Sequence, residues 1–218
     1  MAWAMIPRVN AQPPLGPPPT HWRAFHHDLE RAASDMAGVQ VRLVTRLAWP
    51  FRYLTTALYG LLEALTWSRF DRQAHARSFA KTCGRTIKIP ENFTLDQAWS
   101  VLPHEARHVW QIRRAGLGWI PLGMVVFGLA YVLAPLPVGL AAFRAWAELD
   151  AEAASWRYRL RTAPDAQWAT VAAAIEKRAV AFASTVSGSA YWWSLPASWT
   201  RRWYLRRARA IIAAERRT

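Results

Sequence analysis

The hydrophobic positions of this chain recur mainly three and four residues apart, the spacing of helices that bury one face. One such run follows Thr94 or Asp96, either of which can cap a helix, and predicts about twenty helical residues before the Gly116-Leu-Gly118 breaker. Pro103 lies inside this run and favours a helix start near Ser100, because proline is best tolerated in a first turn. Similar patterns predict a first helix capped by Thr20 and further helices over 40–66, 68–82, 165–186 and 196–216.

Residues 84–90, Gly-Arg-Thr-Ile-Lys-Ile-Pro, alternate apolar and polar positions and are bounded by glycine and proline. This alternation predicts a short strand directly before the helix that begins near Ser100. Since helical spacing dominates the rest of the chain, we expect a mainly α fold with one short strand or small sheet element at this place.

Residues 117–143 carry no charge, a length that is typical of a membrane-spanning helix. Prolines divide the stretch: Pro121 can begin a helix that runs through Ala134, and Pro135-Leu-Pro137 ends it, so that the next helix starts at Val138. Each half is too short to cross a bilayer. We therefore expect an apolar helical hairpin that is buried, interfacial or re-entrant.

The chain of 218 residues suits one domain over residues 20–218, and the proline-rich residues 1–19 predict an extended, poorly ordered arm. No charged start with an apolar run and a cleavage site is found, so we expect no signal peptide. Cys83 is the single cysteine, which excludes an internal disulfide and suits a reducing compartment. A cytoplasmic protein is the expectation.

The net charge of +14 and the 14 tryptophans raise the question of a membrane partner. The predicted C-terminal helix, residues 196–217, is basic and bears aromatic residues, a composition that suits anionic lipid headgroups. Arginine also neutralises nucleic-acid phosphates, but no nucleic-acid motif accompanies these residues. We expect peripheral membrane association, and a solvated basic helix face remains an alternative.

Residues 104–108 read His-Glu-Ala-Arg-His, the spacing at which two histidines share one helix face. His104 and His108 can therefore bind one metal ion, and Glu105 can act as general base on water. This is the H-E-x-x-H pattern of zinc-dependent peptidases.

A catalytic zinc ion usually has three protein ligands, and no histidine follows His108. The metzincins and the SprT-like metallopeptidases, whose third ligand is a downstream histidine, are thereby excluded, and the Gly-Thr-x-x-Asp signature of aspzincins is absent. A carboxylate is therefore the remaining candidate for the third ligand. Glu148 and Glu152 lie four residues apart on one predicted helix, with Asp150 expected on the opposite side.

Over about residues 79–160 these motifs resemble the gluzincins, in which an E-x-x-x-D helix follows the H-E-x-x-H helix. The resemblance implies that Glu148 is the third zinc ligand. Glu152 would then accept a hydrogen bond from a ligand histidine, although aspartate is usual there; the reverse assignment of the two glutamates stays open. Zincins also commonly have an edge strand before the zinc helix, where an extended peptide can add to the sheet.

The resemblance implies a zinc metallopeptidase that hydrolyses a peptide or protein substrate. For the oxyanion we consider Tyr158, Tyr191 and Arg144. Gln111 and Tyr158 are candidates to line the pocket, but packing or exposure to solvent is favoured for both. The competing interpretations are ordinary helix faces, with Glu148 and Glu152 solvated or Glu105 paired with a nearby arginine. The protein would then be a non-enzymatic, membrane-associated basic helical protein or, with less support, a nucleic-acid binder.

Overall fold

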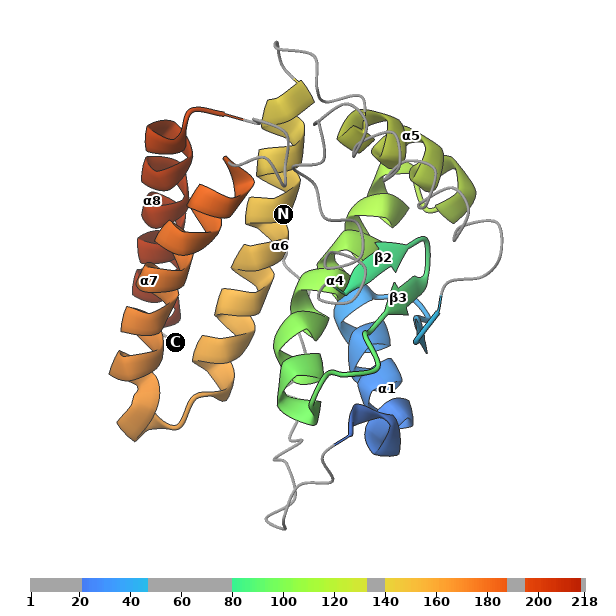
Figure 1. Ribbon diagram of the computed structural model, residues 1–218, viewed down its shortest axis with the longest axis horizontal. Coiled ribbons are helices and arrows are strands. Elements are labelled where there is room, and N and C mark those ends of the chain that lie inside the picture. Colours follow the sequence, from blue (N-terminus) through green and yellow to red (C-terminus); the bar gives the residue numbers. More distant parts are fainter. Residues whose placement is uncertain (1–20, 47–79, 133–139, 188–194, 217–218) are drawn as a thin grey trace.

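The computed structural model describes residues 21–46, 80–132, 140–187 and 195–216 (Figure 1). These residues form six α-helices and one small sheet, so the expectation of a mainly α fold with a small sheet element is confirmed. In chain order the elements are η1 (Trp22–Phe25), α1 (His26–Ala37), β1 (Arg42–Val44), β2 (Lys81–Cys83), β3 (Thr86–Lys88), α4 (Leu95–Ala115), α5 (Ile120–Val132), α6 (Leu140–Thr162), η2 (Asp165–Gln167), α7 (Trp168–Val186) and α8 (Ala197–Glu215).

The sheet has the strand order β1-β3-β2, in which β1 runs parallel and β2 antiparallel to β3. Ile87 of β3 is fully buried between Leu43 and Thr82, its partners on the two sides. The predicted strand therefore exists, but the expectation that it lies at an edge is wrong. Strand β3 has a neighbour on each side, because β1 pairs with it in addition to β2. The segment that forms β1 was predicted to be helical.

The helices predicted over 40–66 and 68–82 are wrong where the structure describes them, since residues 42–44 and 81–82 are strands. Residues 47–66 and 68–79 of these ranges, the arm of residues 1–19 and the Pro135–Pro137 break lie outside the described residues. The helices predicted over 165–186 and 196–216 are confirmed as η2 with α7 and as α8. The residue that caps the first helical segment, η1, is His21, whereas the sequence pattern predicted a cap at Thr20.

Helix α4 begins at Leu95, earlier than the start near Ser100 that Pro103 suggested. A capping box explains the difference: Thr94 accepts a hydrogen bond from the Gln97 amide, and the Gln97 side chain accepts one from the Thr94 amide. Pro103 is thus interior, where it removes one backbone hydrogen bond. Burial of the surrounding face, Leu102 and Pro103 included, offsets this loss.

Two hydrophobic cores lie on either side of the pair α4 and α6, which run next to each other (Figure 1). One core joins α1, the sheet and one face of α4, around Trp22, Leu29 and Ile87. The other joins α6, α7 and α8, around Trp156 and Tyr204. The contact between α4 and α6 is therefore the boundary between the two cores.

Helix α5 turns back sharply from α4, at an angle of 104°. Two glycines permit the close approach: a Cβ on Gly123 would lie 1.9 Å from the Ile112 carbonyl oxygen, and one on Gly116 would lie 2.1 Å from that of Trp119. Within the described ranges no single helix has the length and apolarity to cross a bilayer, whereas α4 and residues 120–130 of α5 meet that test only as this bent pair.

Candidate metal centre

Three side chains from α4 and α6 meet at the boundary between the two cores. The Nε2 atoms of His104 and His108, one helical turn apart, are separated by 3.1 Å. From α6, Oε2 of Glu148 lies 3.3 Å from His104 Nε2, and Oε1 lies 3.7 Å from His108 Nε2. The Glu148 side chain is only 3% exposed, so the carboxylate is held inside the protein.

These three separations fit a shared metal ion. Ligand bonds of about 2.0–2.2 Å at tetrahedral angles place neighbouring donor atoms about 3.3–3.6 Å apart. The donor atoms of the group all lie within 4.8 Å of one another, and two imidazoles with one carboxylate are a common ligand set for divalent metals. His104, His108 and Glu148 can therefore hold a metal ion.

Glu152, one turn after Glu148, contacts the other ring nitrogen of His104. Its Oε2 lies 3.2 Å from His104 Nδ1, while Arg178 of α7 binds its Oε1. Burial lowers the pKa of His104, but hydrogen bonds to Glu148 and Glu152 outweigh it and hold that pKa well above its usual range. Burial raises the pKa of Glu152, yet His104 and the Arg178 charge bring it to about 2. Glu148 thus contacts Nε2 of both histidines, whereas Glu152 contacts Nδ1 of His104 and the Arg178 guanidinium.

His108 is oriented by a neutral amide. Its Nδ1 lies 2.8 Å from Oε1 of Gln111, whose Nε2 donates to the Ala147 carbonyl and to Asp150. Asp150 also accepts two hydrogen bonds from Arg107. Two expectations are therefore wrong: Gln111 neither faces solvent nor merely packs, and Asp150 points to α4 as the glutamates do. The i, i+3 spacing of His108 and Gln111 is the sequence signal that could have identified this pair.

Glu105 lies on the side of α4 that faces the sheet. Its Oε2 accepts a 2.7 Å hydrogen bond from the Thr82 hydroxyl of β2. The carboxylate is buried, and its charge contributes to the raised pKa of His104. Nearby, burial and the charge of Lys88 lower the pKa of Lys81 to about 8, against the attraction of Glu105. Glu105 is therefore close to the histidines without belonging to the metal-holding group.

The interpretations of these glutamates as ordinary surface residues are wrong. Glu148 and Glu152 are buried rather than solvated, and Glu105 is bound to Thr82 rather than paired with Arg107, which contacts Asp150. The sequence pattern alone does not distinguish a buried site glutamate from a solvated one, because a charged residue on a helix is usually exposed.

Aromatic rings border the two histidines. Phe182 of α7 meets His104 edge-on at 6.2 Å between ring centres, and Phe127 of α5 meets His108 at 6.3 Å. Tyr204 of α8, which the sequence analysis missed, is fully buried and donates to the Ala145 carbonyl. Its pKa is raised by burial and by the charges of Glu148 and Glu152. These rings form the apolar part of the surroundings of the group.

The residues considered for an oxyanion occupy different places. Arg144 is buried on α6, one turn before Glu148, and Tyr158 is half-buried further along the same helix, where burial raises its pKa. Tyr191 lies outside the described residues.

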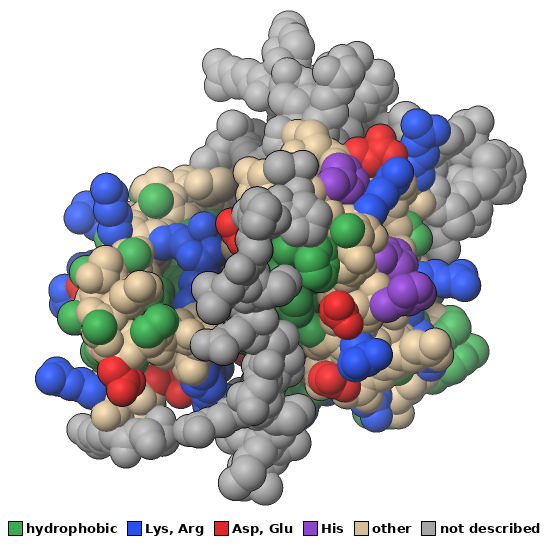
Figure 2. All heavy atoms as spheres, turned by 90° about the horizontal axis from the view of Figure 1, so that it is seen from below, with side chains coloured by type: hydrophobic (Ala, Val, Ile, Leu, Met, Phe, Trp, Pro, Cys, Tyr) green, Lys and Arg blue, Asp and Glu red, His purple; other side chains and the backbone are tan. Residues whose placement is uncertain are grey.

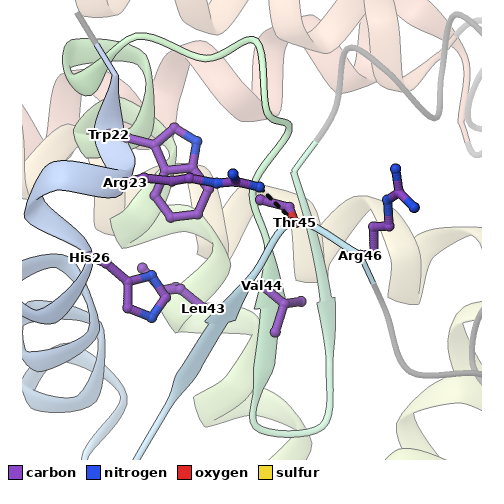
Figure 3. A pocket seen from close by; sticks show the side chains of 7 residues that line it. All are labelled: Trp22, Arg23, His26, Leu43, Val44, Thr45 and Arg46. Carbon is purple, nitrogen blue, oxygen red and sulfur yellow. Dashed lines mark hydrogen bonds between the residues drawn. The ribbon is translucent and has the colours of Figure 1, made fainter.

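A separate pocket of about 450 Å³ lies between η1, α1 and the end of β1 (Figure 3). Within it Arg23 donates to the Thr45 hydroxyl, and none of its lining residues belongs to the metal-holding group. The residues that line it are Trp22, Arg23, His26, Leu43, Val44, Thr45 and Arg46.

Basic side chains are spread over the face in Figure 2 among acidic and apolar ones. On the predicted basic helix, now α8, Arg209 pairs with Glu176, and Glu215 accepts hydrogen bonds from Arg161. Part of the positive charge of this region is therefore compensated within the protein.

Comparison of the chain with protein families, with curated proteins and with solved structures found no match. The interpretation of the metal-holding group therefore rests on its own residues and geometry.

Proposed function

We propose that this protein is a zinc-dependent metallohydrolase whose reaction is the cleavage of a peptide bond. The observation that carries the proposal is the convergence of His104, His108 and Glu148 at the spacing of ligands around one ion. The resemblance of H-E-x-x-H and its downstream glutamates to the gluzincins supports zinc as the metal and a peptide or protein as the substrate.

His104, His108 and Glu148 would hold the zinc ion through the two Nε2 atoms and the carboxylate. When bound, zinc supplies a Lewis acid that polarises a carbonyl group and acidifies water. Glu152 and Gln111 engage the two Nδ1 atoms, which fixes the rings and would leave both Nε2 atoms to bind the ion.

Glu105 is the proposed general base. The Thr82 hydroxyl donates to Oε2 of Glu105, which orients the carboxylate and leaves Oε1 to accept a proton from the attacking water. The same atom then returns the proton to the leaving amine as the peptide bond breaks. Phe127 and Phe182 beside the histidines limit the access of other water to the reacting groups.

Metal analysis of the purified full chain tests the proposal. We expect one equivalent of zinc in the wild type and in Glu105→Gln, and loss of zinc in His104→Ala and Glu148→Ala. Hydrolysis of a mixed peptide library should be lost in all three variants. A wild type without a specific metal equivalent, or a Glu148→Ala variant that binds zinc as tightly as the wild type, would overturn the proposed centre. A Glu105→Gln variant that remains fully active would overturn the role of Glu105.

A further inference from the structure

The exposed apolar side chains of the protein are concentrated at one corner. Within the described ranges eight large hydrophobic residues are exposed, and six of them lie between residues 117 and 129. We define the α5 apolar face by these six: Leu117, Trp119, Leu122, Val125, Val126 and Leu129. Helix α5 lies at the side of the molecule away from α7 and α8 (Figure 1). Concentrated apolar surface of this kind marks an interaction site.

The spacing of these residues gives α5 two different sides. Leu122, Val125, Val126 and Leu129 follow the i, i+3, i+4, i+7 rule and share one helix face. Ile120 and Phe127 are buried against α4 and α6 in a small core with Ile112 and Ala147. The outer side is therefore available to a partner while the inner side holds α5 on the protein.

The turn before α5 extends this face, and packing among the described residues does not explain its conformation. Leu117 has a φ of 52° and is 94% exposed, although leucine gains neither burial nor a relaxed backbone in this position. The turn is nevertheless closed, since the Gly118 amide donates to the Arg113 carbonyl at 2.9 Å. Trp119, which follows, is 64% exposed. The fold thus holds two large apolar side chains outward.

The charges beside the face indicate the chemistry of its partner. The last turn of α4 has Arg113 and Arg114, both exposed. No acidic residue occurs between Glu105 and Glu148 in the sequence. Tryptophan and arginine at the border of an apolar helix face match the headgroup region of a bilayer with anionic lipids.

We infer that the α5 apolar face docks the protein on an anionic membrane surface, with Leu117 and Trp119 inserted among the lipids and Arg114 at the headgroups. This inference is independent of the proposed hydrolase function. Because Phe127 on the inner side of α5 contacts His108, docking would place the candidate metal centre directly behind the membrane-bound helix.

Co-sedimentation of the full chain with phosphatidylcholine vesicles, with and without phosphatidylglycerol, tests the inference. We expect binding to the anionic vesicles and at least about tenfold weaker partitioning for the double variant Leu117→Asn, Trp119→Ser, in which asparagine tolerates the left-handed backbone. Arg114→Gln should weaken binding about fivefold. Lys177→Gln is the charge-matched control for Arg114→Gln, because Lys177 is an exposed cation on α7, away from α5, and its binding should equal that of the wild type.

Hydrogen exchange of the wild type with and without vesicles gives a readout that does not depend on the folding of a variant. Slower exchange in α5 and unchanged exchange in α7 are expected. The inference is overturned if the wild type does not bind, if the double variant binds equally well, or if vesicles leave the exchange of α5 unchanged. It is also overturned if light scattering shows a dimer that the double variant dissociates, since a second copy would then cover this face.

Discussion

Nδ1 of His108 lies 2.8 Å from Oε1 of Gln111, one turn further along α4. The Gln111 amide nitrogen donates to the Ala147 carbonyl, which can only accept, so the amide oxygen must face His108. Nδ1 therefore carries the proton, and Nε2 presents its lone pair to His104 and Glu148. Glu152 imposes the same orientation on His104. When His104 is neutral, three electron-pair donors thus converge, and their repulsion is offset either by a metal ion between them or by a proton on His104 Nε2.

Removal of the Gln111 contact should weaken metal binding. In Gln111→Leu the His108 ring loses its hydrogen-bond acceptor, and we expect the affinity for zinc to fall about 10- to 100-fold. Competition with a chromophoric chelator measures this change. Gln167→Leu, at an exposed glutamine of η2, is the control and should bind zinc as the wild type does. An unchanged affinity in Gln111→Leu would show that the amide does not orient His108.

Substitutions of Glu152 and Arg178 should lower the affinity for zinc to different extents. Glu152→Ala removes the acceptor of the His104 Nδ1 proton and should lower zinc affinity about 10- to 100-fold. Arg178→Gln should lower it less than about tenfold, because Arg178 acts only through Glu152 and is itself half exposed. The same chelator competition measures both variants, with Glu176→Ala on α7 as the carboxylate control. A larger loss in Arg178→Gln than in Glu152→Ala contradicts this order.

Alanine substitutions at two glycines of α5 should change the free energy of unfolding in opposite directions. Gly123→Ala places a Cβ against the Ile112 carbonyl oxygen, a backbone atom that cannot yield cheaply, and should lower the free energy of unfolding by about 1–3 kcal/mol. Gly128→Ala meets nothing within 4 Å and should raise it by up to about 1 kcal/mol through helix propensity. Urea denaturation followed by circular dichroism measures both changes. Equal effects would mean that α5 does not cross α4 as closely as described.

Metal affinity should depend on pH in a defined direction. In the metal-free chain the pKa of His104 lies above its ordinary value of 6.5, so a proton competes with the metal for Nε2. Affinity should therefore rise with pH, by up to about tenfold per pH unit for one proton, and continue to rise above pH 6.5. Isothermal titration in several buffers measures the affinity and the protons released. Affinity that is constant above pH 6.5 contradicts the raised pKa.

The unfolding of the metal-free chain has its own pH dependence. The protonated His104 contributes stability that is fully present below pH 6.5 and is lost as the pH rises through its higher folded-state pKa. Glu152 contributes stability that is present above its ordinary pKa of 4.5 and is lost as the pH falls towards 2. In the Glu152→Ala variant the acid-side loss should be smaller than in the wild type.

The local parts of the site were predictable from the sequence. His104 and His108 share a face because of helix geometry alone, and the helix expected to begin at Pro121 is present as α5, which starts at Ile120. The contacts of Gln111 and Asp150 were not predictable, since they depend on the register between α4 and α6. The central position of β3 depends on β1, more than forty residues earlier, and no local pattern encodes that pairing. The Thr94-x-x-Gln97 spacing is itself a capping-box pattern and indicates the earlier start of α4, against the preference of Pro103 for a first turn.

The candidate ligands belong to different halves of the molecule, because α4 is part of the core with the sheet and α6 is part of the core with α7 and α8. An ion bound here would link the two cores across the contact between α4 and α6. At a free concentration about 100 times its dissociation constant it would add about 2.7 kcal/mol to the free energy of unfolding. Chelation would accordingly lower the melting temperature and loosen the two halves from each other, so that metal supply would govern the integrity of the fold as well as its chemistry.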